Sequence, residues 1–305
     1  MKKVLVTGAE GFTGKYVTAE MKAHGWKVWR TDAQEKPGSP EYRCVDLCHL
    51  ESLCRIIDEI RPDTVIHLAA ISFVGHGDAN AFYRINLIGA RNLLSALAAC
   101  SHRPECVLLA SSANIYGNAA EGVLDETTPP NPANDYAVSK LAMEFMARLW
   151  MDRLPVVLVR PFNYTGVGQA ESFLLAKIAG HFRRRADVIE LGNLDVWRDF
   201  SDVRAVARAY RRLVEVCPAG ETVNICSGRT HSLREALSMA ETIAGHRMRV
   251  EVSPALVRAN EVTTLSGDPT RLRRLIGSWD TPALEETLRW MLEENAGPGG
   301  SYPSI

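Results

Sequence analysis

The sequence predicts an α/β protein built on a doubly wound parallel sheet, with a smaller α/β region toward its C-terminal end. Short runs rich in Val, Ile and Leu alternate with longer segments of helical periodicity, and a glycine-rich segment follows the first of these runs directly. Such alternation is typical of a parallel sheet whose crossover helices cover both faces. The alternation weakens after Arg160-Pro161, where Gly, Pro and Asn become frequent. We therefore expect the sheet to occupy the first half of the chain.

The expected elements can be placed in chain order. Beyond the sheet we expect a helix near 171–183, a strand at 187–190, a helix near 202–216, a strand at 222–225 and a helix after Ser232. Ser232 and Glu235 have the spacing of a capping box, which marks the start of that last helix. For the sheet itself, strands are predicted near 2–7, 26–31, 42–45, 63–68, 104–110 and 154–160, and helices near 11–24, 50–60, 80–100 and 136–150.

The glycine-rich segment Gly8-Ala9-Glu10-Gly11-Phe12-Thr13-Gly14 joins the first strand to the first helix. In such a segment the first glycine permits a tight turn, the second lets the backbone approach a pyrophosphate, and the third lets the helix pack close to the strand. Amide groups at the helix N-terminus then face the anion. Glycines at such a turn can also serve a purely steric role. Their position in the first βαβ unit nevertheless predicts a dinucleotide site of the Rossmann type.

Two acidic residues extend the predicted dinucleotide site. Asp32 ends the second strand, where a carboxylate binds the adenosine ribose hydroxyls and repels a 2′-phosphate. NAD(H) is therefore the favoured cofactor, and NADP(H) is the alternative because the neighbouring Arg30 and Lys36 could accommodate the phosphate. Asp46 follows the third strand and is placed to reach the adenine, or alternatively to cap the next helix.

Three side chains form a candidate catalytic group. Tyr136 and Lys140 stand four residues apart on a predicted helix and therefore share one face. Because a nearby cation stabilises a phenolate, we expect Lys140 to lower the pKa of Tyr136, which can then exchange a proton with the substrate. Ser112 follows the fifth strand at the carboxyl edge of the sheet, where its hydroxyl can stabilise a developing alkoxide. The alternatives are a surface helix pair and, for Ser111 or Ser112, a turn cap.

The composition excludes several classes of function. Lys and Arg number 35 and Asp and Glu number 36, so charge indicates neither a nucleic-acid partner nor a membrane surface. No apolar run approaches the roughly 18 residues that a membrane helix needs. The 7 cysteines form no CxxC pair, so we expect reduced thiols, no metal site and a cytoplasmic location.

Three segments together resemble the extended short-chain dehydrogenase/reductases that act on nucleotide sugars. These are the glycine-rich segment, the run Ser111-Ser112-Ala113-Asn114-Ile115-Tyr116-Gly117, and the Tyr136/Lys140 pair, and the resemblance covers nearly the whole chain. It implies that Ser112, Tyr136 and Lys140 form the catalytic triad. The segments His67-Leu68-Ala69-Ala70 and Ile85-Asn86-Leu87-Ile88-Gly89 match the cofactor side of that family. The expected cofactor contacts are Gly8, Gly11, Phe12, Thr13, Gly14, Asp32, Asp46, Leu47, Leu68, Ala69, Ala70, Asn86, Tyr136 and Lys140.

The second half resembles the branch of this family that handles GDP-mannose derivatives. The resemblance implies that Arg198 and Arg258 pair with the diphosphate of a nucleotide sugar, because a guanidinium makes paired hydrogen bonds to it. Arg198 could alternatively form a salt bridge with Asp199 or Asp202, and Trp197 stands where relatives often have threonine. The similar segments are Arg160-Pro161-Phe162-Asn163, Gly166-Val167-Gly168-Gln169, Val196-Trp197-Arg198-Asp199-Phe200, Arg258-Ala259-Asn260-Glu261-Val262 and Gly267-Asp268. The implied substrate contacts are Ser112, Asn163, Gln169, Arg198, Arg258 and Glu261.

One departure from this branch informs the reaction. Its 4,6-dehydratases carry a carboxylate, usually a glutamate, two residues after the catalytic hydroxyl, because elimination of water needs a base. This chain has Ala113 and Asn114 there, and neither is a base. The resemblance therefore implies NAD(P)H-dependent 4-reduction of GDP-4-keto-6-deoxy-D-mannose or dTDP-4-keto-6-deoxyglucose. The alternatives are a nucleotide-sugar 4-epimerase that holds NAD tightly and a non-catalytic regulator that senses dinucleotides.

We expect two functional regions and a homodimer. Residues 1–165 are expected to form the dinucleotide-binding domain with the catalytic residues. Residues 166–305 are expected to bind mainly the nucleotide sugar, with the chain crossing back to the sheet. The predicted helices near 80–100 and 136–150 are apolar over broad faces, and the equivalent pair forms a dimer interface in relatives. Burial within one subunit is the alternative explanation of these faces.

Overall fold

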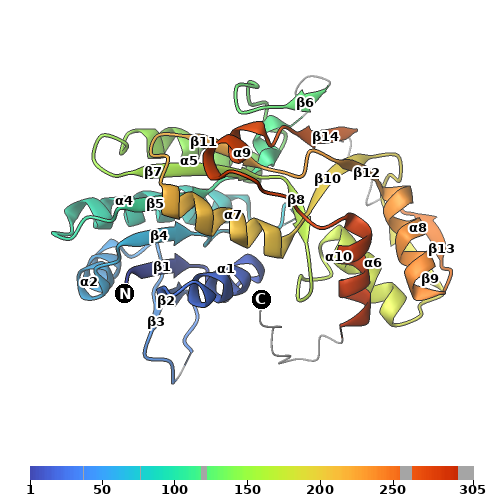
Figure 1. The fold of residues 1–305 in the computed structure, drawn as a ribbon, viewed down its shortest axis with the longest axis horizontal. Coiled ribbons are helices and arrows are strands. Elements are labelled where there is room, and N and C mark those ends of the chain that lie inside the picture. The colour runs from blue at the N-terminus through green and yellow to red at the C-terminus, as the bar shows by residue number, and fades with distance from the viewer. Residues whose placement is uncertain (37, 76, 118–121, 255–262, 295–305) are drawn as a thin grey trace.

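A seven-stranded parallel sheet forms the centre of the larger part of the molecule (Figure 1). The structure, a computed structural model, describes residues 1–36, 38–75, 77–117, 122–254 and 263–294. The strand order β3-β2-β1-β4-β5-β7-β11 reverses direction at β1, as in a doubly wound sheet, so the predicted fold class is confirmed. The strands are β1 Lys3–Thr7, β2 Lys27–Asp32, β3 Tyr42–Cys44, β4 Thr64–His67, β5 Cys106–Ala110, β7 Val156–Pro161 and β11 Thr222–Ile225.

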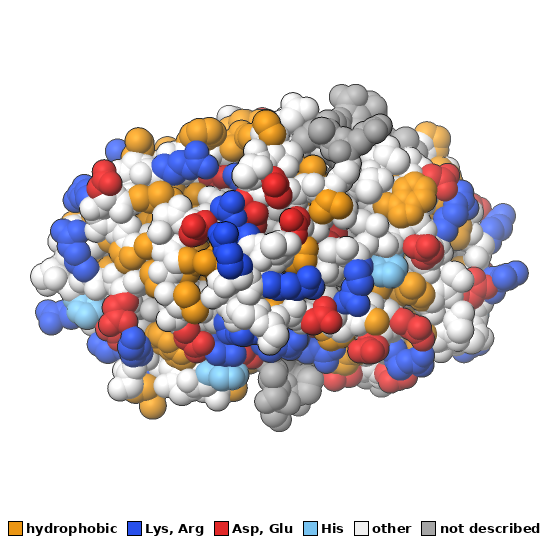
Figure 2. Space-filling view, turned by 45° about the horizontal axis from the view of Figure 1, so that its top comes forward, with side chains coloured by type: hydrophobic (Ala, Val, Ile, Leu, Met, Phe, Trp, Pro, Cys, Tyr) orange, Lys and Arg blue, Asp and Glu red, His pale blue; other side chains and the backbone are white. Residues whose placement is uncertain are grey.

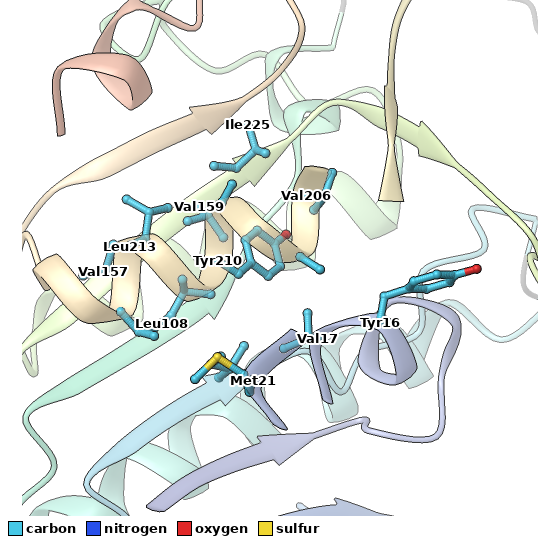
Figure 3. Close-up of a cluster of buried hydrophobic side chains, with 14 of the residues drawn as sticks. Tyr16, Val17, Met21, Leu108, Val157, Val159, Val206, Tyr210, Leu213 and Ile225 are labelled. Carbon is cyan, nitrogen blue, oxygen red and sulfur yellow. The ribbon is translucent and has the colours of Figure 1, made fainter. Parts of the chain in front are cut away.

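Helices cover both faces of this sheet, which explains why its strands are apolar at nearly every position. Along β1, Val4 and Val6 point into one core and Leu5 into the other, and all three are almost fully buried. Figure 3 shows the first core, in which Met21 and Tyr210 meet between two helices and the sheet. The helices of the first face are α1 Phe12–Ala23, α7 Val203–Val216 and α9 Thr270–Ile276, and those of the second are α2 Leu50–Ile60, α4 Ala90–Ala99 and α5 Asp135–Arg148.

The single helix predicted near 80–100 is interrupted. It consists of α3 Ala79–Phe82, the π-helical segment η1 Tyr83–Gly89 and then α4. Asn86 lies within η1 with 1% of its surface exposed, and its amide bonds both the backbone N–H and the carbonyl of Ile71, at 2.9 and 3.2 Å. A π-helical turn offsets the side chains around it, and such turns are frequent at functional sites.

A second, smaller region lies at one end of the molecule (Figure 1). It packs α6 Leu174–Arg183, α8 Leu233–Ala244 and α10 Leu284–Glu293 around a separate core, beside the strand pair β9 Val188–Leu191 and β13 Arg249–Val252. The predicted capping box is confirmed, because Ser232 accepts from the backbone of Glu235 and the Glu235 carboxylate accepts from the backbone of Ser232.

A sheet of short strands connects the two regions and was not predicted. β10 is its longest strand and pairs with β8, β12 and β14. The first half of the chain contributes β6, while β11 of the second half joins the large sheet, so the chain crosses between the regions in both directions. The strands are β6 Val123–Leu124, β8 Asn163–Thr165, β10 Trp197–Asp202, β12 Thr230–Ser232 and β14 Thr264–Gly267.

The surface is mixed in charge. On the face that Figure 2 shows, basic and acidic side chains are intermingled over both regions. This pattern agrees with a formal net charge of −1. Within the described part of the chain, no helix is both long and apolar enough to cross a bilayer.

Candidate active site

A cavity of about 780 Å³ opens where the carboxyl ends of the central strands face the smaller region. This is the edge at which doubly wound sheets bind ligands. Of the described site residues that the sequence predicts, only Asn86 does not line it, because its amide lies behind the wall, bonded to Ile71 and to Ser139. Arg258 and Glu261 lie outside the described residues. The cavity gathers Gly8, Gly11, Phe12, Thr13, Gly14, Asp32, Asp46, Leu47, Leu68, Ala69, Ala70, Ser112, Tyr136, Lys140, Asn163, Gln169 and Arg198.

The glycine-rich segment has the close approaches that its spacing predicts. Gly8 has a φ of +67°, and a Cβ there would lie 2.7 Å from the backbone of Ala69 on the neighbouring strand end. A Cβ on Gly14 would lie 2.2 Å from the carbonyl oxygen of Gly8, so the helix can start this close only with glycine. Gly11 is less crowded, since its Cβ would meet only the same oxygen, at 3.2 Å. The loop therefore offers the exposed backbone that a pyrophosphate needs.

The two predicted acidic residues, Asp32 and Asp46, each accept hydrogen bonds from the backbone of nearby loops. One carboxylate oxygen of Asp32 accepts from the Ala33 backbone at 2.8 Å, and the other accepts from the Glu10 backbone at 3.3 Å. Asp46 accepts from the backbone of Cys48 at 2.8 Å, and the N-cap of α2 is His49. The alternative of Asp46 as a helix cap is therefore wrong.

Ser112 is held by two donors. It is the N-cap of a short 3₁₀ helix, η2 Ala113–Tyr116, and its Oγ accepts from the backbone N–H and from the side-chain Nδ2 of Asn114, both at 3.1 Å. The capping alternative thus applies to Ser112, while the hydroxyl of Ser111 is buried without a partner. A hydroxyl has two acceptor lone pairs and one proton. With both lone pairs engaged, Ser112 has one proton to donate, which its hydrogen bond with Tyr136 uses in the protein alone, so a substrate oxygen would take the place of Tyr136 as its acceptor.

Burial governs the protonation of Tyr136. The phenol is 7% exposed, and burial raises its pKa to about 12, although a hydrogen bond with Ser112 acts in the opposite direction. The prediction that Lys140 lowers this pKa is therefore wrong for the protein alone. The Lys140 ammonium is directed to the backbone oxygen of Ala110, to which it donates at 2.7 Å. Near neutral pH Tyr136 is a protonated phenol.

Lys140 is also buried, and burial lowers its pKa to about 8, while the charge of Glu144 acts to raise it. Glu144 in turn forms a buried ion pair with Arg160, with contacts of 2.9 and 2.7 Å. His67 lies nearby on β4, where burial and the charge of Lys140 lower its pKa to about 3. The imidazole is thus neutral near neutral pH, whereas Lys140 titrates close to it.

The opposite wall carries polar groups suited to a ligand. Asn163 lines the cavity, and its Nδ2 is buried without a hydrogen-bond partner among the described residues, although buried donors are normally bonded. Gln169 is held by Thr165 at 2.7 Å and by the backbone of Tyr164 at 3.2 Å. Arg198 donates to the backbone oxygens of Trp197 and Thr263, at 2.9 and 3.2 Å.

The two acids proposed as alternative partners of Arg198 are occupied by other groups. Asp202 pairs with Arg204 at 2.7 Å. Asp199 accepts from Ser227 and from the backbone of Gly228, at 2.7 to 2.8 Å. Both acids thus make contacts of their own, and Arg198 lines the cavity.

Tyr164 and Lys177 are polar lining residues that the sequence analysis did not identify. Tyr164 stacks on Phe12 with ring centroids 6.2 Å apart, and its hydroxyl is 2.7 Å from that of Thr13, so it links β8 to the glycine-rich loop. Lys177 lines the cavity from α6 and donates to the backbone of Glu190 at 2.6 Å. Tyr164 directly follows the predicted Asn163, and this adjacency was the available signal. Lys177 follows no motif.

Sequence comparison gives relatives over nearly the whole chain. Residues 5–291 match the family described as GDP-mannose 4,6 dehydratase. A GDP-6-deoxy-D-talose 4-dehydrogenase from Aggregatibacter actinomycetemcomitans is 33% identical over 279 residues, which cover 90% of this chain and 92% of the relative. A GDP-6-deoxy-D-mannose reductase from Pseudomonas aeruginosa is 35% identical over 304 residues, covering 96% and 97%.

Solved structures are also similar to this chain over nearly its whole length. A Burkholderia cenocepacia protein provisionally described as an epimerase superposes with a TM-score of 0.90 at 50% identity, covering 96% of this chain and 97% of that one. The structure of RMD from Pseudomonas aeruginosa complexed with NADPH superposes with a TM-score of 0.84 at 33% identity, covering 96% and 98%.

Proposed function

The chain belongs to the GDP-mannose 4,6-dehydratase family, and from this membership we propose that it catalyses the NAD(P)H-dependent 4-reduction of a nucleotide-activated 4-keto-6-deoxyhexose. GDP-4-keto-6-deoxy-D-mannose and dTDP-4-keto-6-deoxyglucose are the two candidate substrates. The names of the two curated relatives, a reductase and a 4-dehydrogenase of GDP-6-deoxyhexoses, favour the GDP sugar. The product would be a nucleotide-activated 6-deoxyhexose.

The observation that carries this proposal is the set of groups around Ser112. Elimination of water would need a base beside it, and the following positions hold Ala113 and Asn114. The Asn114 amide donates to Ser112 instead, at 3.1 Å. A site with donors and a protonated Tyr136, but no carboxylate at this position, suits the delivery of a proton to a carbonyl oxygen.

The residues present suit a nicotinamide dinucleotide. Gly11 and its neighbours in the loop would hold the pyrophosphate, Asp32 the adenosine ribose and Lys140 the nicotinamide ribose. When bound in reduced form, the cofactor supplies a hydride to C4 of the sugar. Tyr136 would give its phenolic proton to the oxygen on C4, while Ser112 donates a hydrogen bond that orients the same oxygen.

The substrate would lie against the other wall of the cavity. Asn163, with its unpartnered Nδ2, and Arg198 would bind the diphosphate and the adjoining ribose, and Gln169 would extend this wall. In this proposal residues 1–165 bind the cofactor and carry the catalytic groups. Residues 166–305 mainly bind the nucleotide sugar, with Arg258 and Glu261 among the contacts.

We also propose that the protein is a cytoplasmic homodimer. Along α5 and at its C-terminal end, Val138, Phe145 and Leu149 are 37%, 55% and 79% exposed, at a spacing that places them on one face. Ile88 of η1 is 44% exposed and adds to the apolar surface of these two elements. Apolar surface concentrated on adjacent helices favours association. The cysteines are free thiols, which suits a reducing compartment.

The experiment that tests the reductase is the loss of reduced-nicotinamide absorbance when purified protein meets GDP-4-keto-6-deoxymannose, with the thymidine-diphosphate ketosugar run beside it. Stoichiometric consumption is expected, abolished by Tyr136→Phe and retained by the control Tyr83→Phe, whose hydroxyl bonds Asp135 outside the cavity. The ketosugar that is reduced faster would show which nucleotide the substrate carries.

No consumption with either ketosugar would refute the reductase. The second candidate, a 4-epimerase, rests on the provisional description of the Burkholderia cenocepacia structure. Protein that retains oxidised NAD through purification and interconverts UDP- or GDP-hexoses without net cofactor turnover would establish that activity.

A further inference from the structure

One side chain of the glycine-rich loop, Glu10, pairs with two cations beside Asp32, which lines the cavity where the adenosine ribose is expected, although Glu10 and its two partners do not themselves line it. Its Oε1 is 2.7 Å from Nη1 of Arg30, and its Oε2 is 2.5 Å from Nζ of Lys36. The Arg30 and Glu10 side chains are 15% and 24% exposed, so this pair is screened less than a surface pair. The Glu10 backbone N–H donates to Asp32 at 3.3 Å, which joins the cluster to the expected ribose site.

The cations of this cluster are the groups that could receive a 2′-phosphate. A phosphate monoester carries roughly two negative charges near neutral pH and is bound best by arginine or lysine. Here both carboxylate oxygens of Glu10 engage those cations, and the second nitrogen of Arg30, Nη2, donates to Ser39 at 2.6 Å. Formally the two acids, Glu10 and Asp32, balance the two bases. A phosphate would therefore have to displace one carboxylate and approach another.

A ribose with two free hydroxyls meets no such conflict. Asp32 can accept hydrogen bonds from hydroxyls while the pairs of Glu10 with Arg30 and Lys36 stay intact. The carboxylate of Glu10 thus removes the attraction for a phosphate without removing the contacts for a ribose. Exclusion of a competitor by an unfavourable charge is a common route to specificity.

We propose that Glu10 is a specificity-determining residue that, together with Asp32, selects NADH against NADPH by neutralising Arg30 and Lys36. The proposal rests on the proposed use of a nicotinamide dinucleotide. It assigns to the loop residue before Gly11 a role beyond the turn geometry of the glycines.

The test measures the Kd of NADH and of NADPH for the whole protein, from the fluorescence change of the bound reduced cofactor and without sugar substrate. Wild-type protein is expected to bind NADH more tightly by about tenfold or more, and Glu10→Gln is expected to tighten NADPH binding by about tenfold with little change for NADH. The gain should shrink as ionic strength rises. The matched control is Glu105→Gln, which removes a surface carboxylate paired with one lysine, Lys2, at 2.6 Å.

Lys36→Gln keeps the test decisive if Glu10→Gln does not fold, and a double variant identifies the cation responsible if it does. Lys36→Gln removes a half-exposed side chain and should leave the NADPH Kd within about twofold, because Lys36 is already neutralised by Glu10. A tenfold loss of NADPH affinity in Lys36→Gln would overturn the proposal, as would a wild-type preference for NADPH. The double variant Glu10→Gln with Arg30→Gln should lose the gain seen in Glu10→Gln.

The outcomes separate this proposal from the proposed reaction. Discrimination in binding that depends on Glu10, with no turnover of either ketosugar, would support the role of Glu10 and refute only the reductase. Turnover of a ketosugar with an unchanged ratio of the two Kd values in folded Glu10→Gln would refute only the role of Glu10.

Discussion

Replacing Glu144 by glutamine tests the buried ion pair that supports the catalytic helix. Both members are almost completely buried, with side chains 4% exposed for Arg160 and 1% for Glu144. The carboxylate accepts from Nε and Nη2 of Arg160 at 2.9 and 2.7 Å, while Nη1 of Arg160 donates to Tyr116 at 2.9 Å. Glutamine keeps one acceptor oxygen but turns an NH₂ group toward a guanidinium that only donates. The variant therefore leaves a buried cation without its counter-ion.

The expected cost follows from that burial. Removing one partner of a buried pair destabilises a protein by about 3–5 kcal/mol. At about 2 °C per kcal/mol for a chain of this size, the apparent Tm of Glu144→Gln should fall by about 6–10 °C. Because the charge of Glu144 acts to raise the pKa of Lys140, that pKa should also move below about 8.

The assay is thermal unfolding followed by circular dichroism, with a matched surface pair as control. Arg234 and Asp195 make a contact of the same kind at 2.8 Å, with side chains 61% and 64% exposed. Asp195→Asn should change stability by less than about 1 kcal/mol. If Glu144→Gln unfolds within about 2 °C of wild type, the assumed cost of a buried unpaired guanidinium is wrong for this site. Glu144→Leu combined with Arg160→Met should recover part of the loss, because no charge then remains buried.

Three further predictions concern the cavity. Gly14→Ala places a Cβ 2.2 Å from the Gly8 oxygen. Gly14→Ala should lower the free energy of unfolding by about 1–3 kcal/mol and weaken NADH binding. The control Gly77→Ala, whose Cβ meets nothing within 4 Å, should change neither quantity. Wild-type stability and Kd in Gly14→Ala would contradict the close packing of α1. The Kd of NADH should rise as the pH passes about 8, where Lys140 loses its charge, and a constant Kd up to pH 10 would show that this charge does not hold the cofactor. Asn114→Ala removes one donor to Ser112 and should lower kcat by about two- to tenfold, equivalent to one neutral hydrogen bond, with KM little changed in steady-state assays. An unchanged kcat would mean that the backbone donor suffices.

The sequence was most informative where local physics decides the structure. The strands of the large sheet are buried on both faces, so their apolar runs stand out, and α2 spans 50–60 as predicted. The glycine-rich loop could also be predicted, because at Gly8 and Gly14 neighbouring backbone atoms lie so close that no residue with a Cβ fits. Most of the predicted cavity residues could be identified from these elements, because the carboxyl ends of parallel strands lie at one edge of the sheet.

The connecting sheet could not be predicted, because its short strands form only by pairing with segments distant in the chain. β6 has two residues and pairs with β14, which is more than a hundred positions away in the chain. β8 and β10 also pair over a distance in the chain, with Asn163 opposite Phe200. Strands this short carry no periodicity, and their existence depends on tertiary contacts. Lys177 lies on a helix that was predicted, but only the tertiary structure shows that this residue faces the cavity.

Protonation could not be predicted from spacing alone, and it bears most directly on the reaction. The spacing of Tyr136 and Lys140 suggests a stabilised phenolate, but burial raises one pKa to about 12 and lowers the other to about 8. Ionising Tyr136 at pH 7 would then cost about 7 kcal/mol, a cost that hydrogen bonds to the phenolate or a positive charge beside it would reduce. Oxidation of a sugar hydroxyl begins with that ionisation, whereas reduction of a ketone uses the phenol as it stands. In the protein by itself Tyr136 is therefore set to give a proton to a ketone oxygen.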